Sequence, residues 1–120
     1  MTHFDKTWFG AVMVDGRTYR DILVIGGKVI ERELFRPGWF DDHSHHTVYD
    51  HELKELLMGN PEVIIIGSGQ SGVLQVPDEV KRVIEKKGIE LIVVETQRAI
   101  EEYNKLSKAK RVNALIHTTC

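Results

Sequence analysis

Two short apolar runs, separated by a helix-like stretch, constrain the fold of this chain more than any other feature. The runs are VIII at 63–66 and LIVV at 91–94. The stretch between them carries Val80, Val83 and Ile84 at helical spacing. A strand that is apolar at every position is typical of a parallel sheet with helices on both faces. We therefore expect both runs to be central strands, joined by a helix whose apolar stripe faces the sheet.

The first third of the chain has the pattern of an antiparallel meander. Three strands are expected, at 8–14, 18–25 and 28–34. The turns between them are predicted at Asp15-Gly16 and Gly26-Gly27, because glycine readily adopts the positive φ of a two-residue hairpin. The last of these strands carries three successive charged residues from Glu31 onward, so it is expected to be exposed or at a sheet edge.

A loop and a short helix are expected between the meander and the first apolar run. Residues 35–46 (FRPGWFDDHSHH) are mostly polar and follow neither the helical nor the strand period, which predicts a loop. Thr47 can cap a helix that ends near Gly59. After the second apolar run the alternation continues with a helix at 97–108 and a strand at 111–117.

The composition is that of one small globular domain. The 120 residues, 13.7 kDa in mass and 42% hydrophobic, fit a single domain spanning 1–120. A formal net charge of −2 provides no field for nucleic acid. The first residues, MTHFDKTW, are charged where a signal peptide is apolar, and no aliphatic run is long enough to span a bilayer. We expect a cytoplasmic protein, and the single cysteine, Cys120, fits a reducing compartment. Abundant Lys and Glu also suggest a thermophilic source.

A GxGxxG motif follows the first apolar run, at Gly67, Gly69 and Gly72. In a dinucleotide-binding fold the helix begins within this motif, so that its first amides face the pyrophosphate. Here the helix is expected only from Pro77. We interpret the motif as a strand-to-helix connection and expect no cofactor. An alternative is that Gly67, Ser68 and Gly69 offer backbone donors to a smaller anion or a carboxylate.

Two further groups of residues are weak candidates for chemistry. The histidine-rich loop provides metal-capable side chains at His43, His45 and His46, but adjacent loop residues have no enforced geometry, so no physiological metal site is expected. The last residues, IHTTC, contain His117 and Cys120. Along an extended strand these two side chains point to opposite faces, so activation of the thiol by the imidazole is not expected.

Several motifs resemble the Mth-type "domain of unknown function" family, whose relatives include an adipogenesis-associated protein and a mitochondrial complex I assembly factor. The similarity runs from about Trp8 to the end of the chain, and the ending IHTTC is similar to short archaeal-type members. The matched positions are Gly67 and Gly69 in the glycine loop, Thr96, Ala99, Tyr103, Asn104 and Leu106 in a helix, and the run from Arg111 to Ile116.

This resemblance implies a three-layer (β+α)/β/α fold with a mixed central sheet and an extra small β layer. It implies no assigned reaction, and its relatives act through other proteins. The expected function is therefore a non-catalytic binding or assembly module with a protein partner, present as a monomer or small homo-oligomer. The alternative is a small-ligand binding protein or enzyme with a cleft at the glycine loop. Its candidate residues are Gly67, Ser68, Gly69, Thr96, Asn104 and Arg111.

Overall fold

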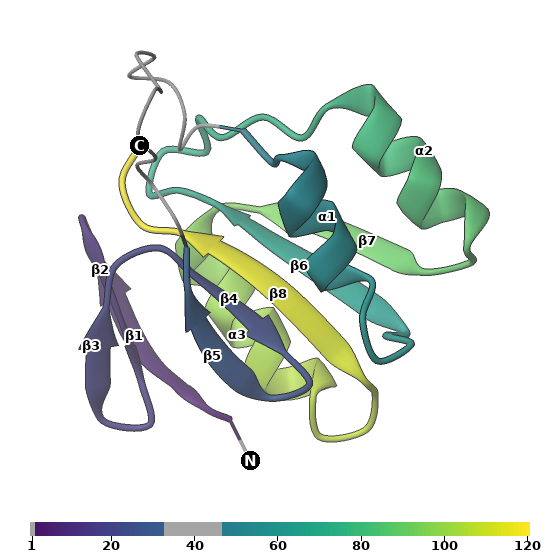
Figure 1. The fold of residues 1–120 in the computed structure, drawn as a ribbon. Coiled ribbons are helices and arrows are strands. Elements are labelled where there is room, and N and C mark those ends of the chain that lie inside the picture. Colours follow the sequence, from purple (N-terminus) through teal and green to yellow (C-terminus); the bar gives the residue numbers. More distant parts are fainter. Residues whose placement is uncertain (1, 33–46) are drawn as a thin grey trace.

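The computed structural model of this chain describes residues 2–32 and 47–120 (Figure 1). The expected loop at 35–46, with its candidate metal ligands His43, His45 and His46, lies outside the described residues. In chain order the elements are β1 (Phe4–Trp8), β2 (Ala11–Val14), β3 (Arg17–Tyr19), β4 (Ile22–Ile25), β5 (Lys28–Glu31), α1 (Asp50–Leu56), β6 (Val63–Ser68), α2 (Asp78–Lys86), β7 (Glu90–Val94), α3 (Thr96–Leu106) and β8 (Val112–His117).

The strands form two sheets. The larger sheet has five strands in the order β5-β4-β8-β6-β7. In it β6 is parallel to both β7 and β8, whereas β4 is antiparallel to β5 and to β8. The smaller sheet has three antiparallel strands in the order β1-β2-β3. The expected mixed central sheet and small additional β layer are therefore confirmed.

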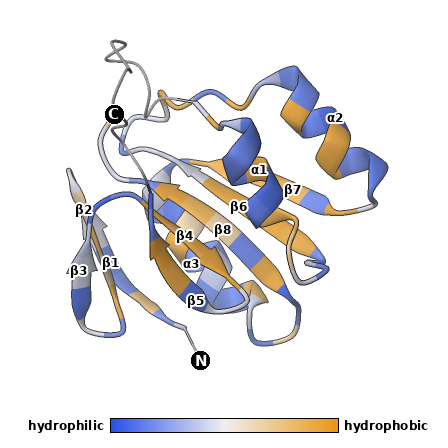
Figure 2. Cartoon of the chain, in the orientation of Figure 1, coloured by the Kyte–Doolittle hydropathy of each residue, from blue (hydrophilic) through white to orange (hydrophobic). Residues whose placement is uncertain are grey.

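Both faces of the larger sheet are covered, which completes three layers. On one face α3 packs between the two sheets, where Phe4 of β1 meets Tyr103 edge to face with ring centroids 5.0 Å apart. On the other face α1 and α2 pack through Leu56, Val80 and Ile84 (Figure 1). The apolar residues accordingly concentrate on the inner strands, while α2 is polar on its outer side (Figure 2).

The expected strand at 18–25 is wrong, because this segment contributes to both sheets. β3 ends at Tyr19 and β4 begins at Ile22, and between them Asp21 is turned inward with an exposed fraction of 3%. The polar contacts of Asp21, described below, lie where the chain passes from the smaller sheet to the larger one. The expected strand at 8–14 is likewise shorter and forms β2, which pairs with β1, a strand that the pattern did not predict.

The predicted hairpin turns are confirmed. Asp15 and Gly16 have φ of 48° and 80°, and Gly26 and Gly27 have φ of 57° and 80°. All four lie in the left-handed region, as a type I′ hairpin turn requires. The expected edge position of the third strand is also confirmed, since β5 is an outer strand of the larger sheet.

The expectation that both apolar runs are central strands holds for the first run alone. β6 is buried along its whole length, but β7 is the other outer strand, and its Val93 is 39% exposed. The second fully buried strand is β8, which lies between β4 and β6. An edge strand has a neighbour on one side alone, so its apolar side chains are less completely covered. Val83 of α2 is also 37% exposed, which leaves Val80 and Ile84 as the buried stripe.

The first helix begins later than expected. Thr47 does not cap it but forms an isolated bridge with Gln75, and the N-cap is Tyr49. Glu52 closes the capping box, since its Oε1 accepts the Tyr49 backbone N–H at 3.1 Å. After the helix, Gly59 has a φ of 78°, in agreement with the expected helix end.

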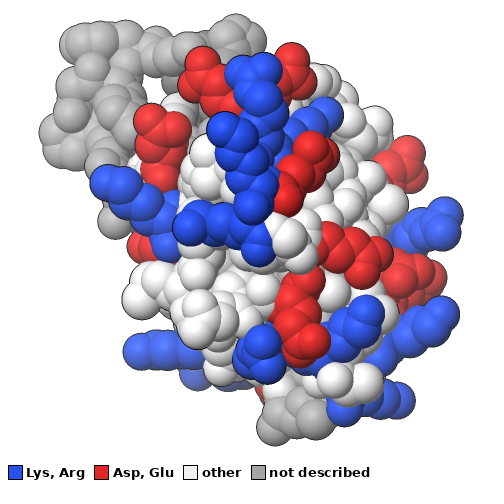
Figure 3. Space-filling model, turned by 90° about the vertical axis from the view of Figure 1, so that its right-hand side faces the viewer, with Lys and Arg blue, Asp and Glu red and all other residues white. Residues whose placement is uncertain are grey.

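The surface carries charges of both signs. On the face shown in Figure 3, Lys and Arg side chains lie next to Asp and Glu side chains rather than forming a field of one sign. Within residues 2–32 and 47–120, no helix has the length and apolar character needed to cross a membrane.

Candidate functional site

The glycine motif lies at the carboxyl end of β6, where the chain leaves the larger sheet. Gly67 and Ser68 are the last residues of this strand, and α2 begins at Asp78, as late as the sequence indicated. Gly69 and Gly72 have φ of 105° and 73°, values that residues other than glycine rarely adopt. The loop therefore turns sharply above the sheet before the helix starts.

The backbone donors of this loop are occupied by the chain itself. Gly69 N–H donates to Thr96 Oγ1 at 2.9 Å. The next donors bind residues 119–120: Gln70 N–H to Thr119 O at 2.6 Å, and Ser71 and Val73 N–H to Cys120 O at 3.1 and 2.9 Å. The remaining pairs are Gly72 N–H with Gly69 O and Leu74 N–H with Ser68 O. An anion can reach the amides of Gln70, Ser71 and Val73 only by displacing residues 119–120.

Close packing explains why two of these positions are glycine. A Cβ built on Gly69 would lie 2.3 Å from the carbonyl carbon of Cys120, which is backbone and cannot rotate away. A Cβ on Gly67 would lie 3.1 Å from Thr96 Oγ1 and 3.2 Å from Ala99 Cβ. Gly67 thus lets α3 approach β6, and Gly69 lets residues 118–120 pass over the loop.

Thr96 joins these elements from the first turn of α3. Its hydroxyl accepts the Gly69 N–H and donates to the carbonyl oxygen of His117, and the residue has no exposed surface. Thr96 does not cap α3, because the N-cap of this helix is Glu95. The amide that the hydroxyl satisfies belongs to the glycine loop instead of to the helix.

Two of the sequence candidates lie away from this loop. Asn104, near the other end of α3, binds β1: its Oδ1 accepts Phe4 N–H at 2.8 Å and its Nδ2 donates to Phe4 O at 2.7 Å. Arg111 precedes β8 and donates from Nε to Asn60 O at 2.8 Å. Because β6 and β8 are parallel, Arg111, which precedes β8, and Gly69, which follows β6, lie at opposite ends of these strands. The structure thus brings Gly67, Ser68, Gly69 and Thr96 together and separates Asn104 and Arg111 from them.

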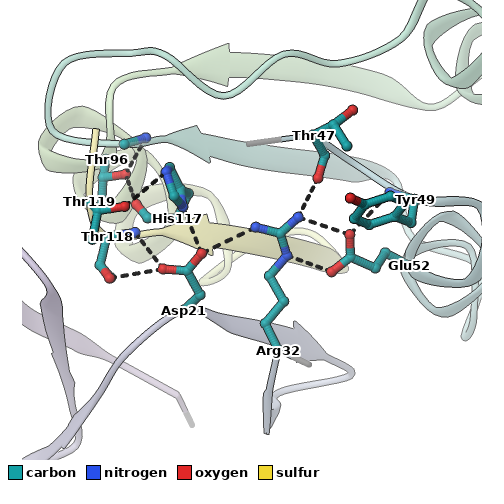
Figure 4. A network of polar contacts seen from close by, with 10 residues as sticks. Asp21, Arg32, Thr47, Tyr49, Glu52, Thr96, His117, Thr118 and Thr119 are labelled. Carbon is teal, nitrogen blue, oxygen red and sulfur yellow. Dashed lines mark hydrogen bonds and ion pairs between the residues drawn. The ribbon is translucent and has the colours of Figure 1, made fainter. Parts of the chain in front are cut away.

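A buried polar network lies beside the glycine loop (Figure 4). At its centre Arg32 binds two carboxylates, Asp21 Oδ2 at 3.1 Å through Nη1 and Glu52 Oε1 at 3.0 Å through Nη2. The Arg32 side chain also donates to Thr47 O. The three ionic side chains are at most 2% exposed. Each charge is therefore compensated within the protein, as burial of an ion requires.

The network continues from Asp21 to the last residues of the chain. His117 Nδ1 lies 2.6 Å from Asp21 Oδ2, and Thr118 donates to Asp21 Oδ1 from both its N–H and its hydroxyl, at 2.8 and 2.9 Å. Burial alone would raise the pKa of the Asp21 carboxyl. The hydrogen bond and charge of His117, with the two donors of Thr118, outweigh burial and hold that pKa below its ordinary value. Asp21 thus remains a carboxylate that anchors residues 117–118.

The contacts Asp21–His117–Thr119 have the order of a catalytic triad, in which a general base activates a hydroxyl. Asp21 orients His117, whose Nε2 lies 3.2 Å from Thr119 Oγ1. A carboxylate, an imidazole and a hydroxyl in this order form the general-base relay of acyl-transfer enzymes. However, His117 has no exposed surface, and a catalytic base must reach the substrate. The arrangement in this structure serves to hold residues 117–119 over the sheet.

The sequence did not reveal this network, and its signal is faint. Arg32 stands in a run of three charged residues at the end of the edge strand β5, and Asp21 follows Arg20 and directly precedes the buried strand β4, so neither pattern marks a buried ion. Their partners Glu52 and His117 are 20 residues from Arg32 and 96 residues from Asp21. Among the described residues, no group of three or more His, Cys, Asp or Glu side chains is arranged to hold a metal ion.

A cleft of about 460 Å³ opens next to the glycine loop, above the carboxyl ends of β6 and β7. Ser68 and Gly72 line it on the loop side, Val94 and Glu95 on the side of β7, and Lys81 at α2. The Ser68 hydroxyl donates to Val94 O at 3.1 Å, which ties the two strand ends together. In open α/β sheets, ligands commonly bind at this edge.

Comparison with known proteins identifies similar chains. A family model described as "Protein of unknown function (DUF498/DUF598)" matches residues 4–117. The solved structure of MT938 shares 37% sequence identity with this chain, covers 100% of both chains and superposes with a TM-score of 0.77. The conserved hypothetical protein PH1505 from Pyrococcus horikoshii OT3 shares 27% identity, covers 98% of both chains and has a TM-score of 0.80. An outer membrane protein from Bartonella henselae, at 22% identity and a TM-score of 0.71, shares the fold.

Proposed function

The chain belongs to the DUF498/DUF598 family of proteins of unknown function, and from this premise we propose that it is a non-catalytic binding or assembly module that acts through a protein partner. The observation that carries this proposal is the internal use of the polar groups at the carboxyl edge of the sheet. The amides from Gly69 to Leu74 and the buried network at Asp21 all bind acceptors and donors of the chain itself. A catalytic site needs such groups to face a substrate.

An exposed aromatic turn provides the surface for a partner. Phe9 and Trp8, at the turn between β1 and β2, are 66% and 42% exposed. The turn is anchored beside the glycine loop, since Gln70 Nε2 donates to Trp8 O at 3.1 Å and Gly10 N–H donates to Thr118 O at 2.9 Å. Exposed aromatic side chains on a rigid support are typical of protein interaction sites. We call Trp8 and Phe9 the aromatic turn.

The resemblance described above supports the same role. Its relatives, an adipogenesis-associated protein and a mitochondrial complex I assembly factor, act through other proteins. The proposal takes residues 1–120 as one domain that works in the cytoplasm, as a monomer or a small homo-oligomer.

Affinity purification tests the partner role. The tagged full chain, the Trp8→Ala/Phe9→Ala variant and the control Val83→Ala are expressed in the native source. Val83 is also an exposed apolar residue, but it lies on α2. The wild type and the control are expected to recover the same protein in stoichiometric amount, and the double variant to lose it while keeping its thermal midpoint. Recovery of the bait alone at every salt concentration, or equal recovery by all three chains, would contradict the proposal.

The second candidate function is binding of a small anion or carboxylate in the cleft at the glycine loop. The cleft of about 460 Å³ supports it, with Ser68, Glu95 and Lys81 as polar lining. Of the candidates named from the sequence, Ser68 lines this cleft, whereas Gly67, Gly69 and Thr96 are not among its described lining residues. A thermal-shift screen with nucleotides, phosphates and carboxylates tests it, with Lys81→Gln as the variant. A rise in midpoint that Lys81→Gln removes is the expected result, and a flat response to all three classes would eliminate this function.

A further inference from the structure

A second cavity, of about 350 Å³, lies at the end of the larger sheet where β8 begins, opposite the end that carries the glycine loop. Its base is formed by Val112 and Asn113. Three turns surround this base: the β4–β5 hairpin at 26–27, the turn at Gly59 after α1, and the loop at 107–111 after α3. The cavity is therefore separate from the cleft at the glycine loop and shares no lining residue with it.

Asn113 fixes the walls of this cavity. Its side chain is buried, with Oδ1 accepting the Gly26 N–H at 3.0 Å. Its Nδ2 donates to Leu56 O and Met58 O, both at 2.8 Å. One amide group thus holds the hairpin and the end of α1 in place. Sites for small molecules are usually preformed in this manner.

The turns border the cavity with bare backbone. Gly26 and Gly59 have φ of 57° and 78°, and a Cβ built on either would meet no atom within 4 Å. Glycine is required here for conformation, and its lack of a side chain leaves room that other residues would occupy.

Hydroxyl groups line the same space. Thr2 donates to Gly27 O, and Ser107 and Tyr103 contribute from the end of α3. Burial raises the pKa of Tyr103, with the charge of Asp15 acting in the same direction and a hydrogen bond with Thr2 opposing them. The phenol therefore stays neutral at physiological pH and can donate a hydrogen bond.

The charged residues at this cavity are both cations. Lys110 and Arg111 line it, and no described Asp or Glu does. Arg111 faces the exposed carboxylate of Glu62 at 3.6 Å, whereas Lys110 makes no ion pair with any described residue. Two positive charges, with no described carboxylate in the lining, favour a negatively charged ligand.

We propose that this cavity binds a small organic carboxylate, with the carboxyl group at Lys110 and Arg111 and an apolar body against Tyr103 and Val112. The volume lies within the range of small-molecule sites, and an inorganic anion would fill a minor part of it. The apolar wall selects an organic body, and the cations select its charge. This inference is independent of the partner role, because it concerns another edge of the sheet.

Titration of the ¹⁵N-labelled full chain with benzoate, followed by amide chemical shifts, tests the proposal. Saturable shifts are expected at 26–27 and 107–113. Lys110→Gln is expected to raise the Kd about tenfold, the effect of losing one charge-assisted hydrogen bond. The matched control is Lys86→Gln, at an exposed position of α2 that lines neither cavity, and it leaves the Kd unchanged. Arg111→Gln provides a second test, with thermal midpoints to show that both variants fold.

Benzyl alcohol and inorganic phosphate are the comparison probes. Weaker binding of both supports the proposal, since the alcohol lacks the charge and phosphate lacks the apolar body. Binding of either probe as tightly as benzoate overturns it. So do shifts centred on Ser68 and Glu95, an unchanged Kd in both cavity variants, or the absence of saturable shifts with benzoate.

Discussion

Asp21 and His117 are 96 positions apart in the sequence, yet the carboxylate Oδ2 and the imidazole Nδ1 lie 2.6 Å from each other in the interior. Asp21 precedes β4 and His117 ends β8, so the contact joins two neighbouring antiparallel strands. Through Asp21 it also connects residues 117–118 with Arg32 and Glu52. The pair is thus the link between the last residues of the chain and the buried ions.

Replacing Asp21 by Asn is expected to destabilise the protein in a manner that depends on pH. The folded state depresses the pKa of Asp21, so its stabilising contribution is fully present above about pH 4, the range of an unfolded Asp, and is lost as pH falls through the lower folded value. The difference in unfolding free energy between wild type and Asp21→Asn should therefore be large at pH 7 and shrink in acid. Urea denaturation from neutral to acidic pH measures it, with Glu101→Gln, at an exposed position of α3, as control. A difference that does not change with pH would contradict this account.

Replacing Arg32 by Met is expected to cost about 3–5 kcal/mol, because the carboxylates of Asp21 and Glu52 would remain buried without their cation. Arg82→Met on the exposed side of α2 is the matched control and should change stability by less than about 0.5 kcal/mol. Equilibrium unfolding of both variants at neutral pH provides the comparison. Equal stabilities would mean that the buried ion pairs contribute nothing net.

Replacing Gly69 by Ala is expected to release residues 118–120 from the glycine loop. The new Cβ would collide with the backbone of Cys120, whereas at Gly72 the nearest atom, Glu95 Cγ, lies at 3.5 Å. In both variants the free energy of unfolding is expected to fall by about 1–2 kcal/mol, because alanine rarely adopts the positive φ of these positions. Hydrogen exchange separates them: the amides of Ser71 and Val73 should exchange faster in Gly69→Ala than in Gly72→Ala. Equal protection in the two variants would show that the contact with Cys120 does not hold the loop.

Replacing Thr96 by Val is expected to lower the free energy of unfolding by about 1–3 kcal/mol, although the two side chains have nearly the same shape. The substitution leaves the Gly69 N–H and the His117 carbonyl without the hydroxyl that binds both. Thr96→Ser keeps the hydroxyl and should retain most of the stability. Thermal and urea unfolding of the two variants give the measurement, and equal losses would assign the effect to the methyl group instead.

The local patterns predicted the elements of the α/β half well, because burial on both faces imposes an apolar run on β6 and helical spacing on α2. They failed on long-range placement. LIVV forms an outer strand, while VNALIH, with its polar Asn113 and His117, is fully buried. The side chains of Asn113 and His117 form hydrogen bonds with distant segments, which allows them to be buried. Their polarity in the sequence therefore gave no indication that this strand is fully buried.

The candidate site was predictable to the extent that it depends on neighbours in the sequence. The late start of α2, which separates the glycine motif from the helix, was predicted correctly from the position of Pro77. Arg32, which follows the edge strand β5, is buried although the run of charges from Glu31 predicted exposure. No spacing rule pairs it with Asp21 and Glu52, since those contacts arise only when three separate segments meet.

The position of β8 also determines how the larger sheet can assemble. β8 is the last of its five strands in chain order, yet it lies in the middle of the sheet, between β4 and β6. Without β8 the hairpin β4–β5 and the unit β6–α2–β7 have no strand to join them, and their edges and apolar faces stay open to solvent. The sheet therefore closes only through contacts between segments that are distant in the sequence, and a chain cut before Val112 would leave two half-sheets that lack the same strand.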